Sequence, residues 1–208
     1  MGRKISVADL RKIHEEHKSW LSTVGEEGRC ADLSETKMSC LKLNKINLSK
    51  ANLSGADLSS ANLWGMIMTG TNLRSANLRG TYLLHGADLT GADMSEADLT
   101  KANLSKAELG NVKLIKANLY KTKLIGANLS GADLSDADLS KTKLNNTKLS
   151  KTRFQNACLR STNLKDAVDL TIEQLSGVKT LYKSKLDAVL MEQVKEKYPH
   201  LLEKIKTI

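Results

Sequence analysis

The sequence predicts an all-β solenoid that carries a helical segment at each end. Two observations support the solenoid. From Leu33 to Leu83, and again from Leu89 to Leu164, a large apolar residue returns at every fifth position. The residue two places earlier is small in most repeats, and the residue directly before the large one is polar or charged in nearly all of them. On both flanks the apolar residues follow helical spacing instead, which predicts the helical ends.

The five-residue period excludes a regular helix or a straight strand for this region. Of the 27 large positions, 23 are Leu, and the residue two places earlier is Ala in 15 repeats and Thr in eight. A helix would rotate successive leucines by about 140° around its axis, and a strand would send alternate leucines to opposite faces. A chain that turns a corner every five residues keeps all of them inside. Stacked coils of such a chain pair like parallel strands, about 4.8 Å apart, and a short self-similar period is the signature of a solenoid.

The repeat A(D/N)Lxx, as in ANLSG (51–55), ADLSS (56–60) and ADLTK (97–101), resembles the repeat of the pentapeptide repeat family. The resemblance extends from residue 31 to about residue 166, and it implies a right-handed quadrilateral β-helix with four repeats per coil. The 27 repeats would then form about seven coils, and the rod would be about 32 Å long at strand spacing. The sequence departs from the family pattern where Lys replaces Asp or Asn before the central Leu.

Both ends of the solenoid need a cover, because an open end exposes core side chains and unpaired backbone groups. An amphipathic helix is expected at residues 6 to 22, where Ser6 and Asp9 have the spacing of a capping box. Thr171 and Gln174 form a second capping box beyond the last repeat. We therefore divide the chain into an N-terminal helical cap at 1–30, a β-helix at 31–168 and a C-terminal helical cap at 169–208.

The C-terminal segment has a longer apolar stripe than one coil end should need. Two interpretations remain open at this point. The stripe could form a two-layer lid within the chain, or it could form a homodimer contact, which the C-terminal helices of the resembled family often supply. The residues that we expect at a dimer contact are Leu190, Val194, Tyr198, Leu201 and Leu202.

The period slips once, in the stretch TYLLHGADL at residues 81–89, where one extra residue enters. With four repeats per coil, several bulky side chains gather on the outside of the rod near this slip. Exposed apolar groups that cluster in this way often mark contact surfaces, although a bulge with local packing explains them too. The candidate protein-contact residues are Trp64, Ile67, Tyr82, Leu84 and His85.

Charge is distributed unevenly along the repeats. Residues 31–100 hold six Lys or Arg and seven Asp or Glu, whereas residues 101–165 hold 13 and four. A coil of twenty residues would stack several of these lysines into columns, which could attract anions, including weak and nonspecific nucleic acid. The alternative is a solvated face that keeps the rod soluble. The candidate anion-binding residues are Lys101, Lys121, Lys123, Lys141 and Lys143.

The sequence contains no pattern that predicts catalysis, a cofactor or a bound metal. His14 and His17, with two glutamates between them, are better explained as part of a cap helix with His17 facing inward. Asp98 and Asp138 recur by the rule of the repeat, so their carboxylates do not indicate acid–base chemistry. We expect a cytoplasmic protein without a membrane span, because the three cysteines have no metal-type spacing and the chain start lacks an apolar signal segment.

These features together predict a non-enzymatic scaffold or protein-binding module, with an unknown partner, in a bacterial cytoplasm. The resemblance implies an alternative, because some pentapeptide repeat proteins imitate a DNA duplex, bind DNA gyrase and protect it from quinolones or toxins. Two features of the sequence disfavour that alternative. Those mimics are acidic rods, whereas the second half of this repeat region is strongly basic. Members that confer quinolone resistance also carry long projecting loops, whereas this sequence has a slip of one residue.

Overall fold

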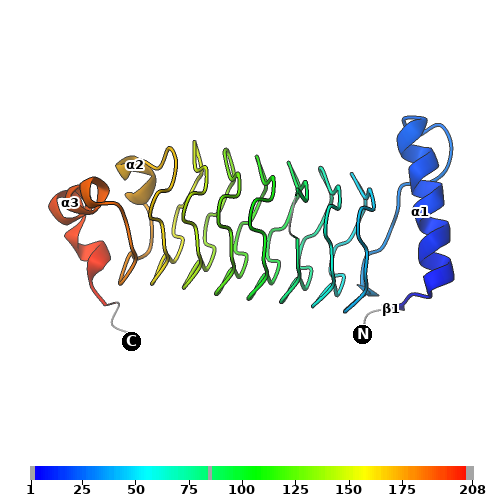
Figure 1. Ribbon diagram of the computed structural model, residues 1–208, viewed down its shortest axis with the longest axis horizontal. Coiled ribbons are helices and arrows are strands. Elements are labelled where there is room, and N and C mark those ends of the chain that lie inside the picture. Colours follow the sequence, from blue (N-terminus) through cyan, green and yellow to red (C-terminus); the bar gives the residue numbers. More distant parts are fainter. Residues whose placement is uncertain (1–2, 84–85, 205–208) are drawn as a thin grey trace.

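The protein is a straight rod of stacked coils with helices at both ends, as the computed structural model in Figure 1 shows. The structure describes residues 3–83 and 86–204. Five short elements interrupt or flank the coils: β1 (Arg3–Lys4), β2 (Thr36–Lys37), α2 (Ile172–Leu175), α3 (Ala188–Lys197) and the 3-10 helix η1 (Pro199–Leu202). The longest helix, α1 (Val7–Ser22), stands at the N-terminal end of the rod.

Backbone hydrogen bonds stack the repeats into four parallel ladders. The outward residue before each central Leu pairs with the outward residue one coil later, as Asn52 pairs with Asn72, 20 positions along the chain. Across the slip the interval is 21, as in the pairing of Ile67 with Asp88. Each coil therefore holds four repeats, as predicted. We number the four sides of the rod by the outward residue of the first coil: Asp32, Lys37, Lys42 and Asn47.

The interior consists of the central leucines and the small residues two places before them. The central Leu of every described repeat is almost fully buried, and Ala at the small position is buried with it. Thr replaces Ala without leaving an unsatisfied hydroxyl, because its Oγ1 donates to a backbone carbonyl. Thr122 Oγ1 lies 2.7 Å from the carbonyl oxygen of Leu99, and Thr142 Oγ1 lies 2.7 Å from that of Leu119. A buried donor with a partner is stable in the core, which explains why these two residue types alternate at one position.

Each corner is a four-residue turn whose two middle residues follow the central Leu. The amide of Ala51, for example, donates to the carbonyl of Leu48 over 3.0 Å. The second corner residue has a positive φ in repeat after repeat, as in type II turns. The outward Asp or Asn supports the turn, because its side-chain oxygen accepts a hydrogen bond from the first corner amide, as Asn47 does from Ser49 over 3.0 Å.

The N-terminal end is closed by β1 and α1. β1 pairs in parallel with β2 of the first coil, so it covers backbone groups that would otherwise be open. Helix α1 begins at the predicted cap, where Ser6 Oγ accepts a hydrogen bond from the amide of Asp9. His17, a residue of α1, is fully buried, as predicted, and its Nδ1 accepts a hydrogen bond from the amide of Ala31 over 3.1 Å.

At the C-terminal end, coil pairing continues further than the repeat pattern does. Cys158 pairs with Thr180, and Asn163 pairs with Lys185, after the chain has left the coil to form α2. The predicted capping box at the start of α2 is present, with Gln174 and Thr171 bonded to each other's backbone amides. Beyond Lys185, α3 and η1 lie across the last coil (Figure 1), where the amide of Leu181 donates to the carbonyl of Leu201.

Candidate interaction surfaces

An apolar patch lies on the outside of the rod where the third side meets the fourth. It consists of Trp64, Ile67 and Tyr82. Ile67 is 42 % exposed and Tyr82 is 54 % exposed, although both occupy outward positions that other repeats fill with polar residues. Trp64 is partly buried, and the ammonium of Lys45 lies 4.7 Å from its ring centroid. The predicted cluster of these three side chains is thus on the surface, whereas the two other candidates, Leu84 and His85, lie outside the described residues.

A basic edge lies on the same third side, further along the rod. The third ladder runs from Tyr82 through Asn103 to Lys123 and Lys143, and it continues through Asn163 to Lys185. The second corner residues that lead into this side form a parallel column, in which Lys101, Lys121 and Lys141 follow one another. All five predicted lysines of the two columns are exposed. The apolar patch and the lysine columns therefore share one side, which the sequence alone did not indicate.

Tyr120 holds two of these lysines together. The ammonium of Lys121 lies 5.2 Å from the centroid of the Tyr120 ring, and that of Lys141 lies 5.3 Å from it. Lys141 Nζ also donates a hydrogen bond of 3.1 Å to the Tyr120 hydroxyl, and this bond lowers the pKa of Tyr120. The ring thereby offsets part of the repulsion between two neighbouring positive charges.

The arginines of the rod, unlike the lysines of these columns, are placed beside carboxylates in three cases: Arg74, Arg79 and Arg153. Arg74 lies 3.2 Å from Glu96 and 3.6 Å from Asp93, and Arg79 lies 2.8 Å from Asp98. No ion pair within 4.0 Å joins any of the five predicted lysines to a carboxylate of residues 3–83 or 86–204. The positive charge of the lysine columns is therefore not neutralised by described neighbours.

The five candidates for a dimer contact lie within and between α3 and η1. Val194 is fully buried and Leu201 is 4 % exposed, so both belong to the core of this chain. Leu190, Tyr198 and Leu202 are partly buried and pack against that core. The apolar stripe is long because two helical segments, α3 and η1, cover the last coil. The stripe does not require a second copy to be buried.

Comparison with known proteins identifies the repeat. The family model of pentapeptide repeats matches in eight copies, over residues 29–65, 51–95, 83–114, 92–131, 113–150 and 127–166. These segments together cover more than half of the chain. The chain is a pentapeptide repeat protein. No curated protein matches it.

Several solved structures of this family are similar to the chain. HetL from the cyanobacterium Nostoc is 26 % identical, with 88 % of this chain and 91 % of HetL covered and a TM-score of 0.31. The fluoroquinolone resistance protein QnrB1 is 23 % identical, with 81 % and 83 % covered and a TM-score of 0.35. A thylakoid lumen protein from Arabidopsis thaliana is 30 % identical, with 55 % and 68 % covered and a TM-score of 0.27.

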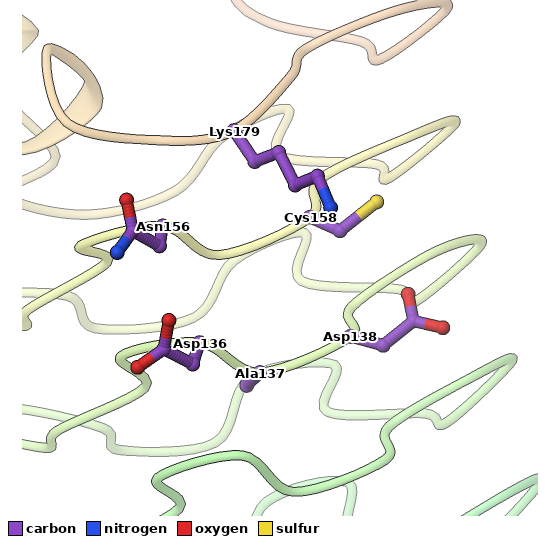
Figure 2. Close-up of a pocket in the computed structure, with 6 residues that line it drawn as sticks. All are labelled: Asp136, Ala137, Asp138, Asn156, Cys158 and Lys179. Carbon is purple, nitrogen blue, oxygen red and sulfur yellow. The ribbon is translucent and has the colours of Figure 1, made fainter. Parts of the chain in front are cut away.

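An open cavity of about 640 Å³ lies where this pentapeptide repeat protein leaves its regular coil before α2. Figure 2 shows the Lys179 side chain reaching from the last coil toward Cys158, with Asp136 and Asp138 on the coil beside it. Cys158 Sγ lies 3.3 Å from Ser140 Oγ, and Asp138 accepts a hydrogen bond from the Ser140 amide. No histidine is among the described lining residues, so the thiol has no general base of the kind that activates a catalytic cysteine.

His14 and His17 do not converge on a common site. His14 lines a surface groove of about 510 Å³ between α1 and the first coil, together with Lys18 and Lys45, whereas His17 is in the core. In the described part of the chain, no three His, Cys, Asp or Glu side chains are grouped to hold a metal ion. None of the helices that the structure describes has the length and apolar character needed to cross a membrane.

Sequence reasoning missed two lysines that extend the basic columns. Lys183 follows the second-corner column, and Lys185 ends the third ladder. A signal was present, because KTKL at 121–124 and 141–144 returns as KSKL at 183–186. The central residues of that last coil, Leu181 and Leu186, are also five positions apart and buried.

Proposed function

We propose that this pentapeptide repeat protein is a non-catalytic scaffold whose apolar patch binds a protein partner. One observation carries the proposal: Ile67 and Tyr82 expose large apolar surfaces at outward positions that are polar in nearly all repeats, and they do so on neighbouring ladders beside Trp64. Val168, the other exposed large apolar residue of a ladder, stands alone past the last repeat. Aromatic side chains are enriched at the centres of protein interfaces. Trp64 adds a partly buried indole beside them, which suits an anchor that becomes fully desolvated in a complex.

The proposal also covers the shape of the scaffold and its cellular compartment. We infer a right-handed quadrilateral β-helix of about seven coils, in which α1 and β1 form one lid and α2, α3 and η1 form the other. The four-repeat interval of the ladders supports the quadrilateral cross-section. The three free cysteines support a reducing compartment such as the cytoplasm.

Site-specific photo-crosslinking in cells tests the partner contact. A photoreactive phenylalanine analogue replaces Tyr82 in one strain and Asn118, an outward residue of the second side, in a matched strain. We expect one discrete crosslinked protein from position 82, none from position 118, and loss of the product when Ile67→Ser is added. The same pattern of products from both positions, or a product that is indifferent to Ile67→Ser, would contradict the proposal.

Interaction with DNA gyrase is the alternative that the family suggests. Its mimicry of DNA depends on an acidic surface, and the exposed lysines of the third side oppose that charge pattern. A gyrase supercoiling assay, with and without a quinolone, separates the two functions. We expect no protection of gyrase and no inhibition at protein concentrations that saturate the crosslinked partner.

A further inference from the structure

The lysines of the third side form a basic face that is interrupted at one coil, where Ser161 and Asn163 occupy the two columns. We define the basic face by two columns of exposed lysines: the corner column Lys101, Lys121, Lys141 and Lys183, and the outward column Lys123, Lys143 and Lys185. The segments 101–106, 121–126 and 141–146, which build most of this face, contain no Asp or Glu. At coil spacing the corner column extends over about 19 Å. Seven positive charges thus lie along one edge of a rigid rod.

The backbone conformation of the corner column is unfavourable for lysine. Lys101, Lys121, Lys141 and Lys183 have φ values of 60°, 59°, 61° and 59°. A non-glycine residue in this left-handed region is destabilised, because its Cβ comes too close to the following carbonyl oxygen. Earlier in the same column Cys40, Ser60 and Gly80 occupy the equivalent corner, with φ values of 60°, 56° and 64°. An added Cβ at Gly80 would meet only an ordinary contact, at 3.7 Å from Ser60 Oγ. Glycine is thus the unstrained choice at this corner, whereas the basic face holds lysine.

The outward column also gives up local hydrogen bonds. Asn103 Oδ1 accepts bonds from the amide and the hydroxyl of Ser105, over 3.2 Å and 2.8 Å. Lysine has no acceptor atom, so Lys123 and Lys143 cannot support their corners in this way. Two kinds of local stabilisation are therefore absent from the same face. Lysine occupies the same two kinds of position elsewhere on the rod, as at Lys50 and Lys113. What distinguishes the third side is the number of lysines stacked there without a described carboxylate partner, and this concentration of positive charge points to an anionic ligand.

The geometry of the face selects the class of ligand. A straight double column of ammonium groups complements a linear polyanion. Protein interfaces are depleted in Lys, and all seven cations here are Lys. An interfacial membrane site needs apolar side chains to insert. The large exposed apolar residue of the third ladder, Tyr82, precedes the lysines, and none of the described exposed large apolar residues lies between Lys101 and Lys143 on this face. Lysine binds phosphate as a point charge, and the hydroxyl of Tyr120, which accepts from Lys141, keeps its own proton to donate to a phosphate oxygen.

We propose that the basic face binds the phosphate backbone of nucleic acid. Phosphate contacts dominate such binding and are independent of base sequence. The two described tyrosines at the corners of this face are covered by ammonium groups, Tyr120 by Lys121 and Lys141 and Tyr182 by Lys183, so base stacking contributes little. The site is separate from the apolar patch, although both lie on the third side, and one partner could occupy each at the same time.

Fluorescence anisotropy with the full-length protein tests this proposal. The probes are a labelled 20-base-pair DNA duplex and single-stranded DNA and RNA of the same sequence, titrated between 50 and 200 mM salt. With about four phosphates neutralised, we expect affinity to fall by on the order of 10²-fold over this range. For the same number of neutralised phosphates, the slope of log K against log salt should be steeper with the duplex probe than with the single-stranded probes. The affinities of the three probes at one salt concentration show which form the protein prefers.

A charge-matched pair of variants locates the site. Lys121→Glu with Lys143→Glu reverses two charges on the basic face, and Lys113→Glu with Lys148→Glu reverses two exposed outward lysines on the first and fourth sides. We expect the first pair to weaken binding at least tenfold and to reduce the salt slope by about 2. The second pair should change affinity less than threefold. Lys121→Ala with Lys143→Ala, which introduces no repulsion, should fall between them.

Three results would overturn the proposal. They are no binding of any probe at 50 mM salt, equal losses in the two charge-reversed proteins, and tighter binding to poly-glutamate or to phosphatidylserine vesicles than to nucleic acid. Circular dichroism melting curves show whether each variant is folded. Because the substituted side chains face solvent, all variants should melt like the wild type.

Discussion

The two halves of the rod share one interior and differ on the outside. In residues 31–100 and 101–165 alike, central leucines and small residues fill the coils. The first half places glycine at five regular corners with positive φ, and its arginines are paired with carboxylates. The second half places lysine at six such corners. The comparison teaches that in this fold the interior fixes the architecture, while the outward and corner positions are free to take on a function at a small local cost.

The largest effect should come from the shared interior, and it should be equal in both halves. Leu58 and Leu119 are central residues of the second side, each 1 % exposed. Leu58→Ala and Leu119→Ala should each lower the free energy of unfolding by about 2–5 kcal/mol, because each leaves a cavity. Urea denaturation followed by circular dichroism measures both. A difference above about 2 kcal/mol between them would show that the halves differ inside as well.

Mild acid, between about pH 6.5 and pH 5, should weaken the N-terminal end through His17. Burial lowers the pKa of His17, and Nδ1 cannot take a proton while it accepts the amide of Ala31. The unfolded chain therefore binds a proton more readily, and stability is lost as the pH falls below about 6.5, by at most about 1.4 kcal/mol per pH unit. Above about pH 6.5, the neutral His17 makes its full contribution to the free energy of unfolding.

Trp20 reports on this transition, because its ring stacks on His17 with the centroids 5.6 Å apart. In a Trp64→Phe variant, Trp20 fluorescence alone follows unfolding by urea. The free energy of unfolding obtained from it should be lower at pH 5.0 than at pH 7.5. His17→Gln should remove the difference between the two pH values. His14→Gln, on the same helix, should leave it unchanged, and loss of the pH effect in that control would exclude His17 as its source.

Exchanging corner residues between the halves should move stability in opposite directions. Gly80→Lys puts lysine into the left-handed corner of the first half and should destabilise by about 1 kcal/mol. Lys121→Gly relieves the same strain in the second half and should stabilise by about 0.5–1 kcal/mol while it weakens nucleic acid binding. Thermal melting and anisotropy, measured on the same protein preparations, test this pair. Stability and binding that rise together in Lys121→Gly would refute the trade-off.

The smallest effect should come from the outward column of the third side. Lys123→Asn should restore the bond between an amide oxygen and the first corner amide that Asn103 makes, and stabilise by about 0.5 kcal/mol. Asn103→Lys should destabilise by a similar amount. Each substitution is combined with a second one of the same kind, so that the change in stability is large enough to measure: Lys123→Asn with Lys143→Asn, and Asn103→Lys with Asn163→Lys. Differential scanning calorimetry measures the change in melting temperature of both double variants. Shifts of the same sign in the two directions would contradict the role of the side-chain bond.

The sequence predicted the interior well because a strict period leaves few ways to bury every leucine. It also located α1 and the capping box at Thr171, where short local patterns decide the structure. The left-handed corners escaped prediction, since lysine at Lys121 gives no hint of positive φ. The sequence could not decide whether Val194 and Leu201 are buried within this chain or in a dimer contact, because an apolar stripe does not reveal which chain packs against it.

The short strand β1 has a consequence for how this protein behaves in a crowded solution. A stack of coils is in principle extensible, since each terminal turn offers its amides and carbonyls to another molecule. Arg3–Lys4 satisfies those groups at Thr36–Lys37 with a segment from the same polypeptide, and it brings two positive charges to the seam. β1 therefore opposes the head-to-tail association of rods into fibres at this end. The number of stacked coils is that of one polypeptide and does not grow with protein concentration.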